Sequence, residues 1–229
     1  MISNDFLKLF LIRFIRRNYL NILSFRKDRV EMIFNILKNI KKRAVYIALG
    51  VIFILSLIFD KKIITLIAGM HNPVLGAFML SVAYASESII MLALVSAVFY
   101  FKKRNKLLNC WFILAVIAFA TLIIKLLIHR TRPFTELDLT VPIEIIKARY
   151  STWDTSFISW HTALAFSVLA FFRWLNLKKV FIGLWIAVAV LTAFSRIYFG
   201  LHYLTDVIAG ACLGFFLTSF LLSKIKNKK

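Results

Sequence analysis

Two histidines and an aspartate in the second half of the chain have residue types and a spacing suited to attack on a phosphate. His202 is followed four residues later by Asp206, and His161 precedes both in a separate segment. On a helix, residues four apart share one face. The carboxylate could then hold one ring nitrogen of His202 while the other attacks phosphorus, and His161 could protonate the leaving group. The alternatives are a self-neutralising His–Asp pair and an interfacial histidine.

Three cations accompany these residues, namely Lys125, Arg132 and Arg196. Such side chains bind the nonbridging oxygens of a phosphate and offset the charge that builds up in the transition state. Lys125 lies about one turn inside the end of an apolar segment, so it could instead extend to the lipid headgroups. For Arg130, as for Lys147 and Arg149, a solvated or headgroup-anchoring role is the favoured interpretation.

Polar residues beside these groups are candidates for supporting roles. Ser159 could bind phosphate through its hydroxyl and amide, or begin a helix as its N-cap. Trp160 could offer its backbone amide to the phosphate, or its ring could reshape the pocket. Glu87 is an acidic residue inside an apolar segment, so we expect it to face the bundle interior and to pair with Lys125 or an arginine, with binding of a polar headgroup as the alternative. Ser195 is a further supporting candidate.

The composition is that of an integral membrane protein. Of the 229 residues 61% are hydrophobic, 23 are Phe, and the mean hydropathy is +0.83, far outside soluble averages. The net charge of +20 flanks apolar stretches as membrane anchors do, which argues against nucleic acid as a partner. The two cysteines form no disulfide or zinc pattern.

Apolar stretches predict an all-α bundle of six transmembrane helices, since a span needs about 20 apolar residues. A basic amphipathic segment over residues 1–43 would lie on the inner leaflet, with a poorly ordered basic tail as the alternative. Residues 44–229 form the membrane domain, in which residues 63–70 would be an interfacial segment. The predicted spans are 44–59, 82–101, 107–128, 162–175, 180–194 and 203–222.

The positions of the basic residues orient the bundle. Most of the 30 Lys and Arg residues lie in four segments, at residues 1–43, 102–106, 173–179 and 224–229. By the positive-inside rule these segments are cytoplasmic, so both termini are cytoplasmic. The segments that carry the two histidines and the three cations then meet on the extracytoplasmic face of the inner membrane.

The motifs resemble those of the type 2 phosphatidic acid phosphatase family. Its first motif, Lys, six residues, Arg-Pro, is met by Lys125 and Arg132-Pro133. Its last motif, Ser-Arg, five residues, His, three residues, Asp, is met by residues 195–206. The middle motif, Pro-Ser-Gly-His, is met in part, because Ile158 stands for Pro and Trp160 for Gly. The resemblance covers most of the chain from residue 44 onward.

The resemblance implies a phosphatase that needs no metal or other cofactor and acts on a lipid phosphate or diphosphate. His202 would form a phosphohistidine, with His161 as general acid and then base. Candidate substrates are a polyprenyl diphosphate, phosphatidylglycerol phosphate, phosphatidic acid and the phosphates of lipid A. Two alternatives are open, a lipid phosphotransferase with the same intermediate and a non-catalytic protein that binds or moves phosphorylated lipids. The headgroup and the oligomeric state have no signal in the sequence.

Overall fold

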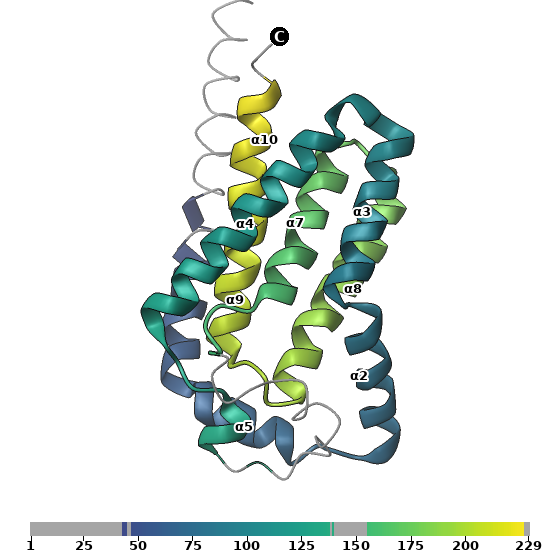
Figure 1. The fold of residues 1–229 in the computed structure, drawn as a ribbon. Coiled ribbons are helices and arrows are strands. Elements are labelled where there is room, and N and C mark those ends of the chain that lie inside the picture. Colours follow the sequence, from purple (N-terminus) through teal and green to yellow (C-terminus); the bar gives the residue numbers. More distant parts are fainter. Residues whose placement is uncertain (1–42, 45–46, 138, 140–154, 227–229) are drawn as a thin grey trace, which may run out of the picture. The chain divides into compact units, whose positions relative to one another are not determined.

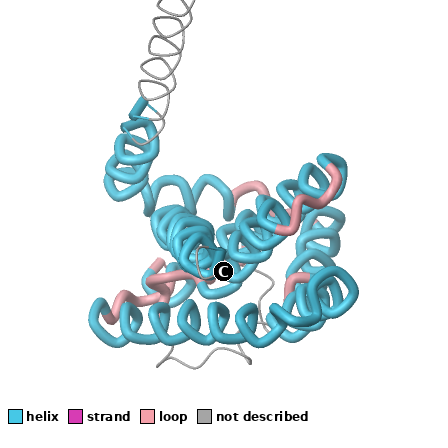
Figure 2. The backbone as a smooth tube through the Cα atoms, turned by 90° about the horizontal axis from the view of Figure 1, so that it is seen from above, coloured by secondary structure: helices cyan, strands magenta, loops and turns pink. Residues whose placement is uncertain are grey.

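All the regular structure in the described part of the chain is helical (Figure 2). The computed structural model describes residues 43–44, 47–137, 139 and 155–226. The chain divides into two compact units, Met1–Ile52 and Phe53–Lys229. In the first unit, residues 47–52 are helical. Residues 1–42 of the predicted amphipathic segment lie outside the described residues, whereas the all-α class is confirmed.

The second unit carries every predicted site residue. Its helices over the described residues are a helix over residues 53–68, α2 (Pro73–Ala85), α3 (Ser88–Lys103), the 3-10 helix η1 (Arg104–Lys106), α4 (Leu107–Ile128), α5 (Pro133–Glu136), α7 (Trp160–Trp174), α8 (Lys179–Tyr198), α9 (Leu204–Cys212), the π-helix η2 (Leu213–Leu217) and α10 (Thr218–Lys226). Figure 1 labels the helices from α2 to α10, without η1 and η2.

Three stretches of the described residues are long and apolar enough to cross a membrane. They are Ser88–Glu136, which includes α3 and α4, the helix α8, and Leu204–Ile225, which joins α9, η2 and α10. The apolar helix α2 is shorter. Many of their large apolar side chains are exposed, among them Ile89, Leu127 and Val180. Such a surface suits contact with lipid; the number of six spans stays a prediction.

Two predicted segments differ in their helical extent from the structure. The span predicted over residues 82–101 is divided, because α2 ends at Ala85 and α3 begins at Ser88. The Ser86 hydroxyl donates to the Ala83 carbonyl, and such local bonds compete with continuation of a helix. Residues 63–68 of the predicted interfacial segment continue the helix that contains Asp60, and their position at the membrane interface stays a prediction.

Helix α7 is the centre of the second unit. It contacts α3, α4, α8, α9, η2 and α10, and its residues Ala163, Leu164, Val168 and Phe171 are fully buried in the main hydrophobic core. Its sequence alternates small and large apolar residues, which lets neighbouring helices pack on every side. A helix buried all round can hold a side chain at its first turn with little freedom.

Two glycines allow α9 and η2 to approach α7 closely. A Cβ on Gly210 would lie 2.6 Å from the Ser159 carbonyl oxygen, and one on Gly214 would lie 2.0 Å from the Ala163 carbonyl oxygen. Only glycine fits such separations. The Ser167 hydroxyl also donates to the Gly214 carbonyl at 3.2 Å. These contacts bring the start of α7, with His161, close to the start of α9.

Candidate active site

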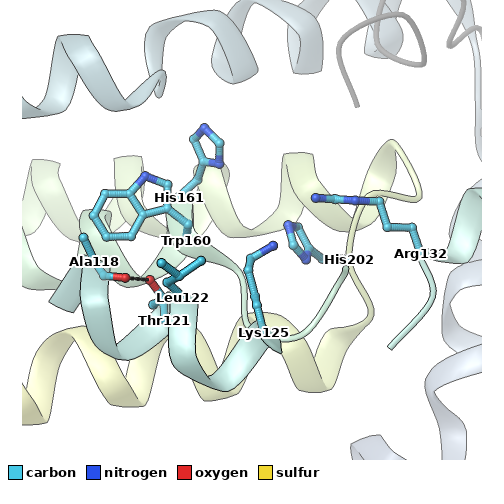
Figure 3. Close-up of a pocket in the computed structure, with 8 residues that line it drawn as sticks. All are labelled: Ala118, Thr121, Leu122, Lys125, Arg132, Trp160, His161 and His202. Carbon is cyan, nitrogen blue, oxygen red and sulfur yellow. Dashed lines mark hydrogen bonds between the residues drawn. The ribbon is translucent and has the colours of Figure 1, made fainter. Parts of the chain in front are cut away.

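A cavity of about 310 Å³ brings together four of the predicted site residues with titratable or cationic side chains. Figure 3 shows Lys125, Arg132, His161 and His202 reaching it from separate segments. Lys125 lies in the last turn of α4, His161 in the first turn of α7, and His202 in the turn between α8 and α9. The remaining lining residues are Ala118, Thr121, Leu122 and Trp160.

The turn that ends α8 sets the direction of the His202 side chain. Gly200 has a φ of +62°, the left-handed conformation that commonly follows the end of a helix and favours glycine. The amides of Leu201 and His202 both donate to the Arg196 carbonyl, at 3.0 and 3.2 Å. His202 therefore precedes α9 and does not lie on it, so the prediction that a shared helical face brings it to Asp206 was wrong.

The Nδ1 atom of His202 faces two oxygen atoms. It lies 2.6 Å from the Ser156 carbonyl oxygen and 3.7 Å from Asp206 Oδ2. A carbonyl only accepts hydrogen bonds, so Nδ1 carries the proton and Nε2 keeps its lone pair. The turn geometry thus selects the tautomer in which Nε2 is the nucleophilic atom.

Burial and nearby cations hold His202 in its neutral form. Its side chain is almost completely buried. Burial is the main cause of a pKa well below the usual value of 6.5, followed by the charges of Arg132, Lys125 and Arg196 and by His161. A neutral imidazole is the form that can attack phosphorus.

Asp206 stabilises the start of α9 as well as facing His202. It is fully buried at the third position of the helix, and its Oδ2 accepts the Tyr203 amide at 2.8 Å in a capping box. Its other oxygen, Oδ1, accepts Arg130 Nη1 at 2.9 Å. The carboxylate is therefore fixed from both sides.

His161 and Trp160 are both attached to the start of α3. His161 Nε2 lies 3.8 Å from Glu87 Oε2, so Glu87 lies beside a histidine, which the sequence did not indicate. The Trp160 indole N–H donates to the Ser88 hydroxyl at 2.8 Å, and its ring forms part of the cavity wall (Figure 3). The break between α2 and α3 brings both partners to the site.

The three predicted cations are all anchored to backbone carbonyls. Lys125 Nζ donates to Thr155 at 2.6 Å and Arg132 Nη1 to Leu201 at 2.8 Å. Arg196 is buried in α8, where Nη2 donates to the Ala83 carbonyl at 3.2 Å and the Ser86 hydroxyl at 3.0 Å. Within the described residues, no group of three or more His, Cys, Asp or Glu side chains is placed to hold a metal ion.

The hydroxyls of the two predicted serines, Ser159 and Ser195, make hydrogen bonds to other groups of the protein. Ser159 is the N-cap residue of α7, but its hydroxyl pairs with Thr162 at 3.0 Å and makes no cap bond. Its amide donates to the Asp206 carbonyl at 3.2 Å, so that amide does not bind phosphate as predicted. The Ser195 hydroxyl donates to the Thr192 carbonyl within α8.

Two charged residues of the site were missed from the sequence. Asp60 is buried, at 2% exposure, and Arg130 joins it to Asp206, with Nη2 2.9 Å from Asp60 Oδ2. The interpretation of Arg130 as a headgroup anchor was wrong, because its guanidinium bridges two buried carboxylates. An acidic residue at the end of an apolar stretch was the one signal that could have pointed to Asp60.

Comparisons with known proteins identify the family of this chain. A family model of the PAP2 superfamily matches residues 106–229. The lipid A 4′-phosphatases of Porphyromonas gingivalis and Bacteroides thetaiotaomicron are 25% and 28% identical over 169 and 173 residues. These matches cover 70% and 69% of this chain and 70% and 72% of theirs. The bacitracin transport permease protein BcrC of Bacillus licheniformis is 35% identical over 150 residues, covering 63% of this chain and 67% of its own.

Two solved structures share the fold. The PAP2-type phosphatidylglycerolphosphate phosphatase of Bacillus subtilis has a TM-score of 0.60 at 22% identity, covering 80% of this chain and 96% of its own. LpxE of Aquifex aeolicus has a TM-score of 0.59 at 21% identity, covering 72% and 95%. The family match spans more than half of the sequence and contains Lys125, Arg132, His161 and His202. The chain belongs to the PAP2 superfamily.

Proposed function

We propose that this protein is an integral membrane phosphatase that hydrolyses a lipid phosphate or diphosphate through a phosphohistidine. The observation that carries the proposal is the single cavity that Lys125, Arg132, His161 and His202 line (Figure 3). Two imidazoles supply a nucleophile and a proton donor, and two fixed cations supply a receptor for the anion. The names of the lipid A 4′-phosphatases and of the B. subtilis enzyme support a lipid phosphate as substrate.

In the first step, His202 Nε2 attacks phosphorus and forms a P–N bond. The P–O bond to the lipid breaks, and the leaving oxygen takes a proton from His161. Ser156 and Asp206 face the Nδ1–H of His202, so they stabilise the positive charge that the ring gains. Burial lowers the pKa of His161, and Glu87, 3.8 Å from His161 Nε2, opposes this effect and so favours the protonated state in which His161 acts as an acid.

In the second step, water breaks the P–N bond. His161, now neutral, takes a proton from the water while the water oxygen bonds to phosphorus. Inorganic phosphate then leaves, and His202 returns to its free state. Lys125 and Arg132 bind the nonbridging oxygens throughout, and Arg196 adds a third positive charge nearby. In this proposal the cations take the role that metal ions have in other phosphatases.

The substrate would reach the cavity from the membrane. Leu122, which lines the cavity, is exposed at 51% on α4, one turn from Lys125. An apolar chain could remain against this face of α4 while its phosphate lies among the cations. We propose six spans with both termini in the cytoplasm and the cavity on the extracytoplasmic side of the inner membrane, as the basic segments indicate.

The test is phosphate release by purified protein from the four candidate classes, namely lipid A, phosphatidylglycerol phosphate, phosphatidic acid and polyprenyl diphosphate. We expect release from at least one class in the presence of a chelator, and a loss of about 10³-fold or more in His202→Asn, as for removal of a nucleophile. His161→Asn should lose about 10²–10⁴-fold, as for removal of a general acid.

The outcomes separate the competing functions. Phosphorylated acceptor lipid with little free phosphate would identify a phosphotransferase, and lipid binding without turnover would identify a non-catalytic protein. Full activity in His202→Asn would contradict the phosphohistidine mechanism.

A further inference from the structure

Both groups that face Nδ1 of His202 are connected to Arg130. The Ser156 carbonyl is 2.6 Å from Nδ1, and the Ser156 amide donates to the Arg130 carbonyl at 2.8 Å. Asp206 Oδ2 is 3.7 Å from Nδ1, and Asp206 Oδ1 accepts Arg130 Nη1 at 2.9 Å. The main chain of Arg130 thus holds one partner of the imidazole, and its side chain holds the other.

The guanidinium of Arg130 is itself fixed on three sides. Nη2 donates to Asp60 Oδ2 at 2.9 Å, and Nη1 also donates to the Thr205 hydroxyl at 2.7 Å. The Thr205 hydroxyl donates to Asp60 in turn, and the Thr205 amide donates to Asp60 Oδ1 at 3.1 Å. The Tyr203 ring lies 3.8 Å from the guanidinium carbon. Asp60 thereby connects the helix over residues 53–68 to the start of α9.

The formal charges of this cluster suit the chemistry of His202. Arg130 contributes one positive charge, and Asp60 and Asp206 contribute two negative charges, so the cluster carries a net charge of −1. Arg130 alone would neutralise the charge of Asp206, and Asp60 adds the second negative charge that makes the cluster negative overall. When Nε2 bonds to phosphorus the ring becomes cationic, and a negative cluster behind Nδ1 stabilises it, because His202 and Asp206 are buried and their charges are little screened.

We propose that Asp60 and Arg130 are positioning residues of the His202 nucleophile. They hold Ser156 and Asp206 against Nδ1, fix the tautomer with a proton on Nδ1, and supply the negative charge that the phosphohistidine step needs. This inference rests on the proposed function and extends it to two residues whose types the three motifs do not specify.

Steady-state kinetics of Arg130→Gln, Arg130→Lys and Asp60→Asn test the proposal. At metal sites, loss of a group that orients a histidine ligand costs about 10–100-fold, and we expect kcat to fall by a similar factor in Arg130→Gln and Asp60→Asn. KM should change by less than about threefold, because neither side chain lines the cavity. Arg130→Lys keeps the charge and should recover part of kcat. The double variant should be no worse than the poorer single variant, because the two residues act as one unit.

The matched control is Arg104→Gln. The Arg104 guanidinium also lies over a tyrosine, 5.0 Å from the Tyr100 ring centre, but it belongs to η1, next to the N-terminal end of α4 and not the end that carries Lys125. This variant removes the same charge and should keep wild-type kcat and KM.

The pH profile separates positioning from a general loss of stability. The acid limb of kcat/KM marks the pH below which free His202 is protonated. Arg130→Gln removes a positive charge, raises the pKa of His202 and moves this limb to higher pH. Asp60→Asn removes a negative charge and moves it to lower pH. The other charged groups that face His202 are unchanged in both variants: Lys125, Arg132, Arg196, His161 and Asp206.

A spectroscopic measurement gives an answer independent of turnover. The chain has four histidines, so ¹⁵N-histidine NMR in micelles can identify His202 by the signal that His202→Asn lacks. Wild-type His202 should show a proton on Nδ1, and Arg130→Gln and Asp60→Asn should show mixed tautomers.

If these variants keep kcat within twofold of wild type, an unmoved acid limb and the wild-type tautomer, the inference is overturned. If wild-type protein releases no phosphate, the proposed function fails, and the NMR result alone decides the positioning role.

Discussion

Trp160 combines two roles at one position. Its ring lines the cavity, and its indole N–H fastens the start of α7 to Ser88 at the start of α3. In the motif that the sequence resembles, a glycine stands here, which would leave the wall without a side chain. The indole therefore narrows the space beside His161 without touching the atoms that react.

We predict that Trp160→Gly changes substrate preference and keeps turnover. Removal of the ring enlarges the cavity, so kcat/KM for a substrate with a bulky headgroup should rise relative to a small one. A change of about tenfold in this ratio corresponds to about 1.4 kcal/mol. Trp160→Phe, which keeps a ring but loses the bond to Ser88, should change the ratio less.

The control for this prediction is Trp185→Phe. The Trp185 indole also donates a hydrogen bond, to the Ala165 carbonyl at 2.8 Å, but Trp185 lies on α8 among Leu94, Phe181 and Leu184. The Trp185→Phe variant should leave the ratio of kcat/KM between bulky and small substrates unchanged. An unchanged ratio in Trp160→Gly, measured on the same panel of lipids, would show that the indole does not select the substrate.

The sequence predicted the residues that line the cavity better than those that support them. Lys125, Arg132 and His202 belong to spaced motifs, so their types and order carry a signal. Asp60 and Arg130 meet across 70 positions of the chain, and no local spacing links them. Ser156 acts through its carbonyl, which every residue type has, so its identity carries no information about this role.

At the scale of helices, the contact of α7 with η2 depends on the absence of a side chain at Gly214. The backbone oxygen of Ala163 occupies the space that a Cβ on Gly214 would need, at 2.0 Å. A methyl group there would separate the two helices, and with them the segments that carry His161 and His202. Packing at this point therefore sets the geometry of the site from one helix turn away.

Gly214→Ala should lower both stability and activity. We expect a loss of about 1–3 kcal/mol, as for overpacked interiors, measured as the free energy of unfolding in micelles. Gly183→Ala is the matched control, because a Cβ on Gly183 in α8 meets nothing within 4 Å. It should be neutral or stabilise the helix by up to about 1 kcal/mol. Equal stability of the two variants would contradict the close contact of α7 with η2.

Helix boundaries were predicted best where charges mark them, and less well where apolar residues continue. The end of α3 coincides with Lys102 and Lys103, whereas the span predicted over residues 180–194 ended too early, because α8 continues to Tyr198. The break at Ser86 and Glu87 was missed because a hydropathy window averages two polar residues with the apolar ones around them. The fold class followed from composition alone, since so apolar a chain has few alternatives to helices in a membrane.

For the whole molecule, the orientation in the membrane rests on charge and is open to direct measurement. We predict that Thr135→Cys reacts with a membrane-impermeant maleimide in intact cells, and that Asn105→Cys reacts only after permeabilisation. Both positions are exposed. They should be examined in a Cys110→Ala, Cys212→Ala background, in which no native thiol remains. Labelling of both from the same side would contradict the predicted topology.

The division of the two imidazoles between α7 and the turn before α9 has a consequence for the biogenesis of the protein. The two rings line one cavity only when the start of α7 packs against the start of α9, the arrangement that the close contacts at Gly210 and Gly214 allow. Phosphate release would therefore report the final docking of the inserted helices, and a turnover assay during synthesis in nanodiscs could time that event.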